Sequence, residues 1–124
     1  MPARKPEECD LLVAEAISNG DVEAAVALYE PDASFAVEPG KEVRGHAAIR
    51  EVMRGFVASK PKLTIEVPRV YQSGDLALLI SKFTMTSTGA DGKQESSSGN
   101  GTEVVRRQPD GTWLFLIDNP NGLA

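Results

Sequence analysis

The chain has 124 residues, of which 41% are hydrophobic, 25% charged and 6% aromatic. This length predicts a single domain spanning residues 1–124, because domains commonly have roughly 100–150 residues. The 13 Lys and Arg residues against 18 Asp and Glu residues give a net charge of −5. That balance argues against nucleic acid or an anionic membrane surface as a partner, since both require a basic patch.

The sequence favours a cytoplasmic protein without a metal or a cofactor. No hydrophobic run approaches the ~20 residues of a membrane-spanning helix, and no signal-peptide segment follows Pro2. The single cysteine, Cys9, cannot form an internal disulfide, which fits a reducing compartment. His46 is the only histidine and has no evident partner for a metal site. The segment 99–101, Gly-Asn-Gly, lacks the Lys-Ser/Thr ending of a phosphate loop.

Two short helices are predicted near the start of the chain and a third after a short hairpin. Gly20 can end the first helix in the left-handed conformation, and Asp21 can cap the second, which Pro31 ends. The third lies between Gly45 and Pro61. The apolar stripes of the three helices are Cys9, Leu12, Val13, Ala16 and Ile17; Val22, Ala25, Val26 and Tyr29; and Ile49, Val52, Met53, Phe56 and Val57.

The rest of the chain alternates as strands. A short hairpin turns at Pro39-Gly40, and four longer strands follow, over 63–71 with a bulge or edge at Pro68, 76–85, 95–107 and 113–118. In the last strand, alternation places Leu114, Leu116 and Asp118 on one face. The order of elements predicts an α+β fold in which a cone-shaped, curved, mostly antiparallel sheet wraps around three N-terminal helices and leaves a cavity.

Three blocks, in the same order along the chain, resemble the nuclear transport factor 2-like, ketosteroid isomerase-like superfamily. They are residues 19–33, residues 44–50 and residues 106–120, of which the last resembles the SnoaL-like branch. The resemblance implies a cystatin-like cone, a homodimer formed through the sheet and a cavity for a small hydrophobic ligand. It also implies cofactor-free acid–base chemistry of the isomerase or cyclase type on a hydrophobic carbonyl compound. The alternative is a non-catalytic ligand-binding or dimerisation module, because this fold hosts both.

The resemblance points to particular catalytic residues. The base of the ketosteroid isomerases corresponds to Glu38, which precedes Pro39. Their oxyanion-binding tyrosine corresponds to Val13, and their protonated acid falls one or two positions from Glu103. Because valine cannot donate a hydrogen bond, the sequence disfavours steroid-type isomerisation.

Asp118 is the first catalytic candidate and Glu38 the second. An acid near the end of the last strand resembles the catalytic position of the SnoaL-like branch, and a desolvated carboxyl there would have a raised pKa. The alternative is that Asp118-Asn119-Pro120 only forms the turn at the end of the strand. The predicted cavity wall includes Tyr29, Phe35, Met53 and Phe56.

Overall fold

The computed structural model describes residues 2–122. Its helices are α1 (Glu8–Ser18), α2 (Val22–Val26) and α3 (His46–Ala58), and its strands are β1 (Tyr29–Glu38), β2 (Lys41–Arg44), β3 (Lys62–Ser73), β4 (Leu76–Thr88), β5 (Gln94–Arg107) and β6 (Trp113–Asn119). The strands form one sheet in the order β2-β1-β6-β5-β4-β3. All neighbouring pairs are antiparallel except β1 and β6, which are parallel.

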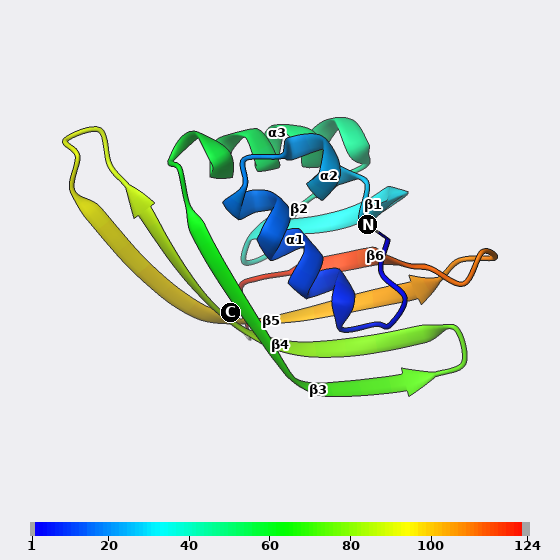
Figure 1. Ribbon diagram of the computed structural model, residues 1–124. Coiled ribbons are helices and arrows are strands. Elements are labelled where there is room, and N and C mark those ends of the chain that lie inside the picture. Colours follow the sequence, from blue (N-terminus) through cyan, green and yellow to red (C-terminus); the bar gives the residue numbers. More distant parts are fainter. Residues whose placement is uncertain (1, 123–124) are drawn as a thin grey trace.

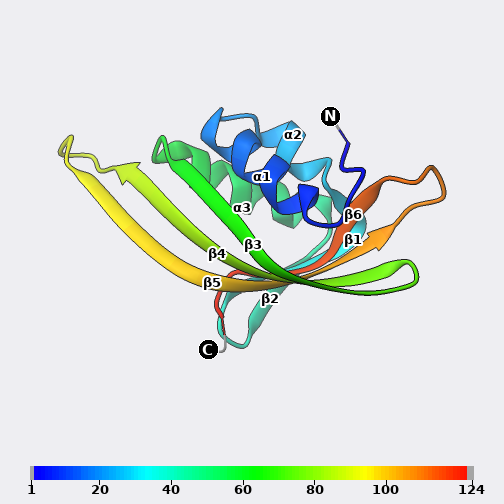
Figure 2. The same cartoon turned by 60° about the horizontal axis from the view of Figure 1, so that its bottom comes forward.

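The three helices lie against the concave face of the strongly curved sheet (Figures 1 and 2). The predicted α+β cone is therefore confirmed. β3, β4 and β5 are the three longest strands, and the ends of β4 and β5 extend past the helices on the left of Figure 1. Within residues 2–122, no helix is long and apolar enough to cross a membrane.

Every pair of neighbouring strands except β4 and β5 has a register shift, and two of these shifts bear on the predictions from sequence. The β3–β4 register shifts between Glu66 and Arg69, around Pro68, as predicted. The β5–β6 register shifts between Val104 and Val105, which leaves Leu116 as an extra residue in β6. An extra residue reverses the alternation beyond it.

The predicted face of Asp118 was consequently wrong. Asp118 pairs with Glu103, and Phe115 pairs with Val105, so both lie on the concave face. Leu116 and Ile117 lie at the bulge, where the side chains of β6 stop alternating strictly between the two faces. An alternating sequence pattern cannot reveal this break. The prediction for the second helix was also wrong at its end, because Tyr29 starts β1 and Pro31 lies within it.

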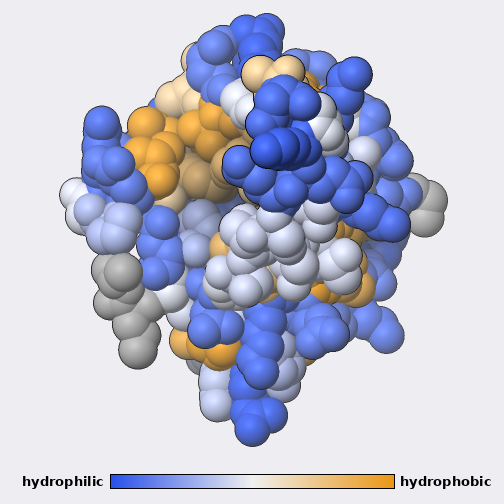
Figure 3. Space-filling model, turned by 90° about the vertical axis from the view of Figure 1, so that its left-hand side faces the viewer, coloured by the Kyte–Doolittle hydropathy of each residue, from blue (hydrophilic) through white to orange (hydrophobic). Residues whose placement is uncertain are grey.

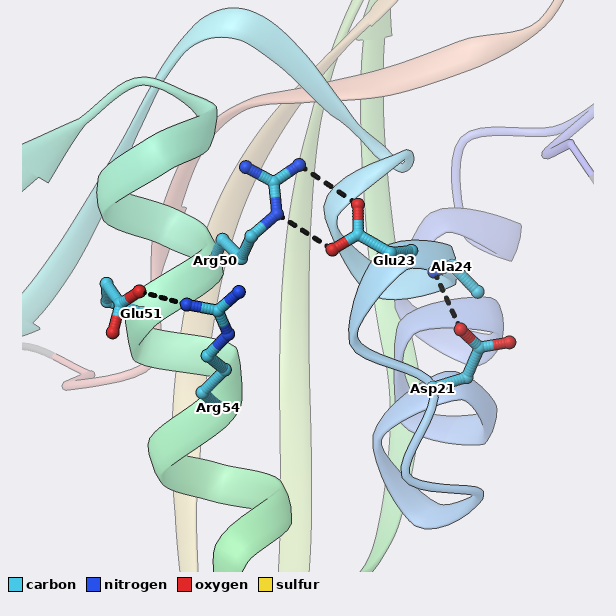
Figure 4. A network of polar contacts seen from close by, with 6 residues as sticks. All are labelled: Asp21, Glu23, Ala24, Arg50, Glu51 and Arg54. Carbon is cyan, nitrogen blue, oxygen red and sulfur yellow. Dashed lines mark hydrogen bonds and ion pairs between the residues drawn. The ribbon is translucent and has the colours of Figure 1, made fainter.

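The signals at Gly20 and Asp21 act as predicted. Gly20 has φ +72° beyond α1, where Asp21 N–H donates to the Ala16 carbonyl at 2.8 Å. The Asp21 carboxylate accepts from Ala24 N–H at 3.0 Å and caps α2 (Figure 4). α2 and α3 are joined by a two-bonded ion pair between Arg50 and Glu23, at 2.8 and 3.0 Å (Figure 4).

Candidate functional site

A cavity of about 440 Å³ lies between the helices and the concave face of the sheet. Hydrophobic side chains gather in a hollow on the side toward which β4 and β5 extend (Figure 3). The cavity wall is mainly apolar and comes from α1, α3 and five strands. Its lining residues include Val13, Ile17, Tyr29, Phe35, Val37, Val52, Met53, Phe56, Leu63, Ile65, Phe83 and Met85, together with the polar residues Asp10, Ser81, Glu103, Asp118 and Asn121.

Asp118 lies in this wall and is 8% exposed. The Tyr29 hydroxyl donates a hydrogen bond to Asp118 Oδ2 at 2.5 Å. The ring of Tyr29 stacks on Phe115, with centroids 4.7 Å apart, which holds the hydroxyl in place. Burial, followed by the nearby Asp10, raises the pKa of Asp118 to about 7, and the Tyr29 hydrogen bond opposes this rise.

Replacing Tyr29 with Phe is expected to raise the pKa of Asp118 further. A hydrogen bond to a charged group contributes about 1.5–3 kcal/mol, so its loss corresponds to a rise of about 1–2 in pKa. Carbon-13 NMR titration of the Asp118 carboxyl measures the change. Tyr71→Phe is the matched control, because Tyr71 is 59% exposed. An unchanged or lower pKa in Tyr29→Phe contradicts the assigned hydrogen bond.

A second pair of carboxyl groups lies beside Asp118. Asp10 of α1 and Glu103 of β5 are each 2% exposed, and they lie close enough to shift each other's pKa. Two buried carboxyl groups this close together do not both ionise readily. Burial, followed by Asp10, raises the pKa of Glu103 to about 11, and burial also raises that of Asp10. The pair therefore holds at least one proton at neutral pH.

Two further residues fix the position of Glu103. The Ser81 hydroxyl donates to Glu103 Oε2 at 3.2 Å. Gly101 pairs with Ser81 across the β4–β5 ladder and leaves the room that these two side chains occupy. A Cβ at Gly101 would lie 2.5 Å from Glu103 Oε2, 2.7 Å from Ser81 Oγ and 3.2 Å from the Asn119 carbonyl oxygen. The first two distances are too short for an added carbon, and the third is tight.

Gly101→Ala is therefore expected to displace Glu103 and to lower the free energy of unfolding by about 1–3 kcal/mol, the usual range for overpacking. Urea denaturation measures this change. Gly55→Ala is the control, since a Cβ there meets nothing within 4 Å and the site is helical. It should stabilise the protein by up to ~1 kcal/mol. Equal effects of the two substitutions contradict the crowding at Gly101.

The structure places most of the site residues that were proposed from the sequence in the cavity wall, and one of them outside it. Tyr29, Phe35, Met53 and Phe56 all lie in the cavity wall, together with Asp118. These positions come from three elements, β1, α3 and β6, and the fold brings them together around the cavity.

Glu38 lies elsewhere. It is exposed at the end of β1, pairs with Lys41 across the β1–β2 hairpin and is not among the cavity-lining residues. Phe35 and Val37 line the cavity. The β1–β2 register shifts between Ala36 and Glu38, so the simple alternation of β1 ends there, and Glu38 lies at the exposed end of the hairpin. The prediction of Glu38 as a group in the site is thus corrected.

Sequence reasoning missed Asp10, Ser81 and the direct role of Glu103. A signal existed for Asp10, which shares a helical face with Val13 and Ile17 at spacings of three and seven. Glu103 lies two residues before Val105 and is therefore on the same face of β5. Among residues 2–122, no group of three His, Cys, Asp or Glu side chains is arranged to hold a metal ion.

The fold is shared with several solved structures. A ketosteroid isomerase-like protein from Erwinia carotovora is 21% identical with a TM-score of 0.80, over 95% of this chain and 93% of that one. A nuclear transport factor 2-like protein with a cystatin-like fold from Novosphingobium aromaticivorans is 21% identical with a TM-score of 0.78, over 94% and 78%. A protein proposed to be a dehydratase of the same superfamily, from Streptomyces avermitilis, is 17% identical with a TM-score of 0.79, over 95% and 94%.

These identities are low, so the likenesses establish the fold and leave the activity open. A search of curated protein sequences finds no match. The family described as the SnoaL-like domain matches residues 12–115, which include α2, α3 and the first five strands. The match covers most of the chain and agrees with the cone and its cavity, and the protein therefore belongs to the SnoaL-like domain family.

Proposed function

We propose that the protein is a cofactor-free acid–base catalyst that moves a proton next to the carbonyl group of a small hydrophobic compound. Asp118 takes and returns the proton. One observation carries the proposal: a carboxyl group with a pKa of about 7 is buried in the wall of an apolar cavity. A carboxyl with this pKa can both accept and return a proton at neutral pH.

The reaction has two steps. The Asp118 carboxylate accepts a proton from the carbon next to the carbonyl, and the electrons of the broken C–H bond form an enolate. The protonated Asp118 then returns the proton to the same carbon or to a conjugated one, so no further reactant is consumed. Tyr29 holds Oδ2 of the carboxylate, which leaves Oδ1 to act on the substrate.

The Asp10–Glu103 pair supplies the hydrogen-bond donor that the enolate oxygen needs. Its carboxylic acid O–H stays protonated at neutral pH because the pair is buried. A preorganised donor of this kind contributes about 10²–10³-fold to the rate. In this proposal the pair does the work of the oxyanion-binding tyrosine of the ketosteroid isomerases, whose position is occupied here by Val13.

Hydrogen–deuterium exchange at the α-carbon of 2-tetralone tests the proposal. This neutral ketone has two fused rings and suits an apolar cavity of about 440 Å³. Proton NMR in D₂O should show loss of the α-proton signal well above the buffer rate. Exchange at the buffer rate, with saturable binding of the ketone, contradicts the catalytic proposal.

That second outcome is the one expected of a non-catalytic ligand-binding module. A specific observation favours this alternative: the Tyr29 and Ser81 hydroxyls donate to Asp118 and Glu103, so neither is free to bind a substrate oxygen. The exchange experiment separates the two functions, because a binding module retains the ketone without exchanging its protons.

We also propose that two copies of the chain pair through the convex face of the sheet. A row of register partners crosses four strands there: Tyr71, Leu78, Val104 and Ile117. Tyr71 is 59%, Leu78 38% and Ile117 44% exposed, and the neighbouring Leu76 is 44% exposed. The helices cover only the other face, and a second copy would bury this row symmetrically.

Leu78→Glu is expected to convert a dimer to a monomer of 13.3 kDa in light scattering at micromolar concentration. The carboxylate would be buried against an apolar surface, and that burial is unfavourable without a partner. Leu11→Glu is the control, because Leu11 is 48% exposed on α1 and away from the sheet. A monomeric wild-type protein contradicts the proposed pairing.

A further inference from the structure

The charge inside the cavity has one sign. Its lining includes the carboxyl groups of Asp10, Glu103 and Asp118, and among the described residues it includes no Lys, Arg or His. Arg106 and Arg107, the two arginines of β5, are not among the cavity-lining residues, and Arg106 pairs with Glu30. A bound anion would therefore meet acids without a compensating cation.

Two oxygen atoms of these carboxyl groups also have no hydrogen-bond partner within the described part of the chain. Asp10 Oδ2 and Glu103 Oε1 are buried, and among residues 2–122 neither atom has a hydrogen-bond partner. The hydroxyls of Tyr29 and Ser81 are already used, on Asp118 Oδ2 and Glu103 Oε2. A ligand that brings N–H donors would supply hydrogen bonds to the carboxyl oxygens in this part of the wall that carry no proton.

The rest of the wall selects the body of the ligand. It is formed by aliphatic, aromatic and methionine side chains, and the cavity has a volume of about 440 Å³. At ~30 Å³ for each water-sized atom, this space holds on the order of 15 non-hydrogen atoms. That corresponds to one or two rings with a short polar end.

We propose that the cavity binds hydrophobic amines in their protonated form, with the ammonium group against Asp118 and the apolar body against the wall, and that it excludes the matching carboxylates. An ammonium donates charge-assisted hydrogen bonds to a carboxylate, which offset the loss of its hydration. The inference shares its cavity with the proposed proton transfer, but it requires no turnover.

The proposal has a defined pH dependence. The titratable groups that face Asp118 are Tyr29 from β1, Asp10 and Cys9 from α1, and Glu103 from β5, and none is cationic. The pKa of Asp118 is about 7 in the empty cavity, so an ammonium that binds below this pH must displace a proton. Its affinity should then weaken by about tenfold per pH unit below neutrality.

Three probes with one naphthalene ring test the proposal: 2-naphthylmethylamine, 2-naphthalenemethanol and 2-naphthoate. Calorimetry measures their binding at about pH 5.5 and about pH 8.5, on either side of the Asp118 titration. We expect the amine to bind more than about tenfold tighter at the higher pH. The alcohol should bind equally at both, and the naphthoate should not bind detectably at the higher one.

A variant and a wild-type measurement then locate the ammonium. Asp118→Asn should abolish the pH dependence of amine binding and leave the alcohol unchanged, whereas Asp32→Asn on the exposed surface should change neither. Should Asp118→Asn fail to fold, calorimetry of the wild type in two buffers of different ionisation enthalpy gives the same information. Amine binding near pH 6 should release roughly one proton.

Naphthoate that binds as tightly as the amine at the higher pH overturns the proposal. So does amine binding that is independent of pH or that releases no proton. The two proposals for this cavity fail separately. Absence of ketone exchange with the amine pattern intact removes only the catalytic function, and exchange without a preference for the amine removes only this inference.

Discussion

Asp118→Asn is expected to lower the rate of α-proton exchange in 2-tetralone by about 10²–10⁴-fold, the usual contribution of a positioned general base. An amide cannot accept the proton. The asparagine has nearly the same shape and its oxygen can still accept the Tyr29 hydrogen bond, so the affinity for the ketone should change little. Proton NMR of the exchange, together with calorimetry of ketone binding, measures both quantities.

The matched control is Asp32→Asn, which makes the same chemical change at an exposed position of β1. Its exchange rate should equal that of the wild type. An Asp118→Asn variant that is folded, binds the ketone and retains the wild-type rate would remove Asp118 from the reaction and leave the ligand-binding module as the better account.

The second large effect concerns stability, which is expected to fall as the pH rises from about 5.5 to about 8. Glu103 and Asp118 have pKa values of about 11 and about 7 in the folded protein, raised mainly by burial from 4.5 and 3.8. Their contribution to stability is complete at a pH below their pKa values in the unfolded chain. It is lost as the pH rises toward their pKa values in the folded protein. Each carboxyl that is protonated only in the folded state lowers the unfolding free energy by about 1.4 kcal/mol per pH unit.

Urea denaturation at several pH values measures this slope. Glu30 has the opposite shift, because Arg106 lowers its pKa, and its contribution is lost only under more acidic conditions. Glu103→Gln keeps the shape of the side chain and removes one titrating group, so the slope should decrease by about 1.4 kcal/mol per pH unit. Glu42→Gln, at an exposed position of β2, should leave it unchanged. Stability that is constant or rises over this range contradicts buried, protonated acids.

The architecture was predictable because its signals are local. The helix end at Gly20, the cap at Asp21 and the irregularity at Pro68 each follow from the conformational limits of one residue type. Together with strand alternation, they fix the order and the approximate length of the elements. The cone follows from that order.

The site was less predictable because it depends on register. The extra residue at Leu116 moves Asp118 to the face of Phe115, and no local pattern in that strand reveals a bulge. The same register places Glu103 directly opposite Asp118. In the sequence, Glu103 was one or two positions away from the expected acid, but in the structure it is a neighbour of the candidate base. The candidate catalytic residue was therefore found for a partly wrong reason.

The positions of the remaining site residues depend on packing between distant parts of the chain. Tyr29 completed an apolar helical stripe in the sequence, but the chain leaves the helix before it. The Leu28 carbonyl accepts the Phe115 N–H at 2.8 Å and starts the parallel pairing of β1 with β6. That contact joins segments almost ninety residues apart. It also aims the Tyr29 hydroxyl at Asp118, a role that no pattern near Tyr29 could indicate.

Proton transfer, amine binding and the pH dependence of stability all require acids that are kept from water in an apolar cavity, and carbon-13 NMR titration of the wild-type carboxyl groups measures this property. We expect Asp118 to titrate with a pKa of about 7 and Glu103 to remain protonated up to pH ~8. Titration of both groups near the ordinary carboxyl value of ~4 would contradict this expectation.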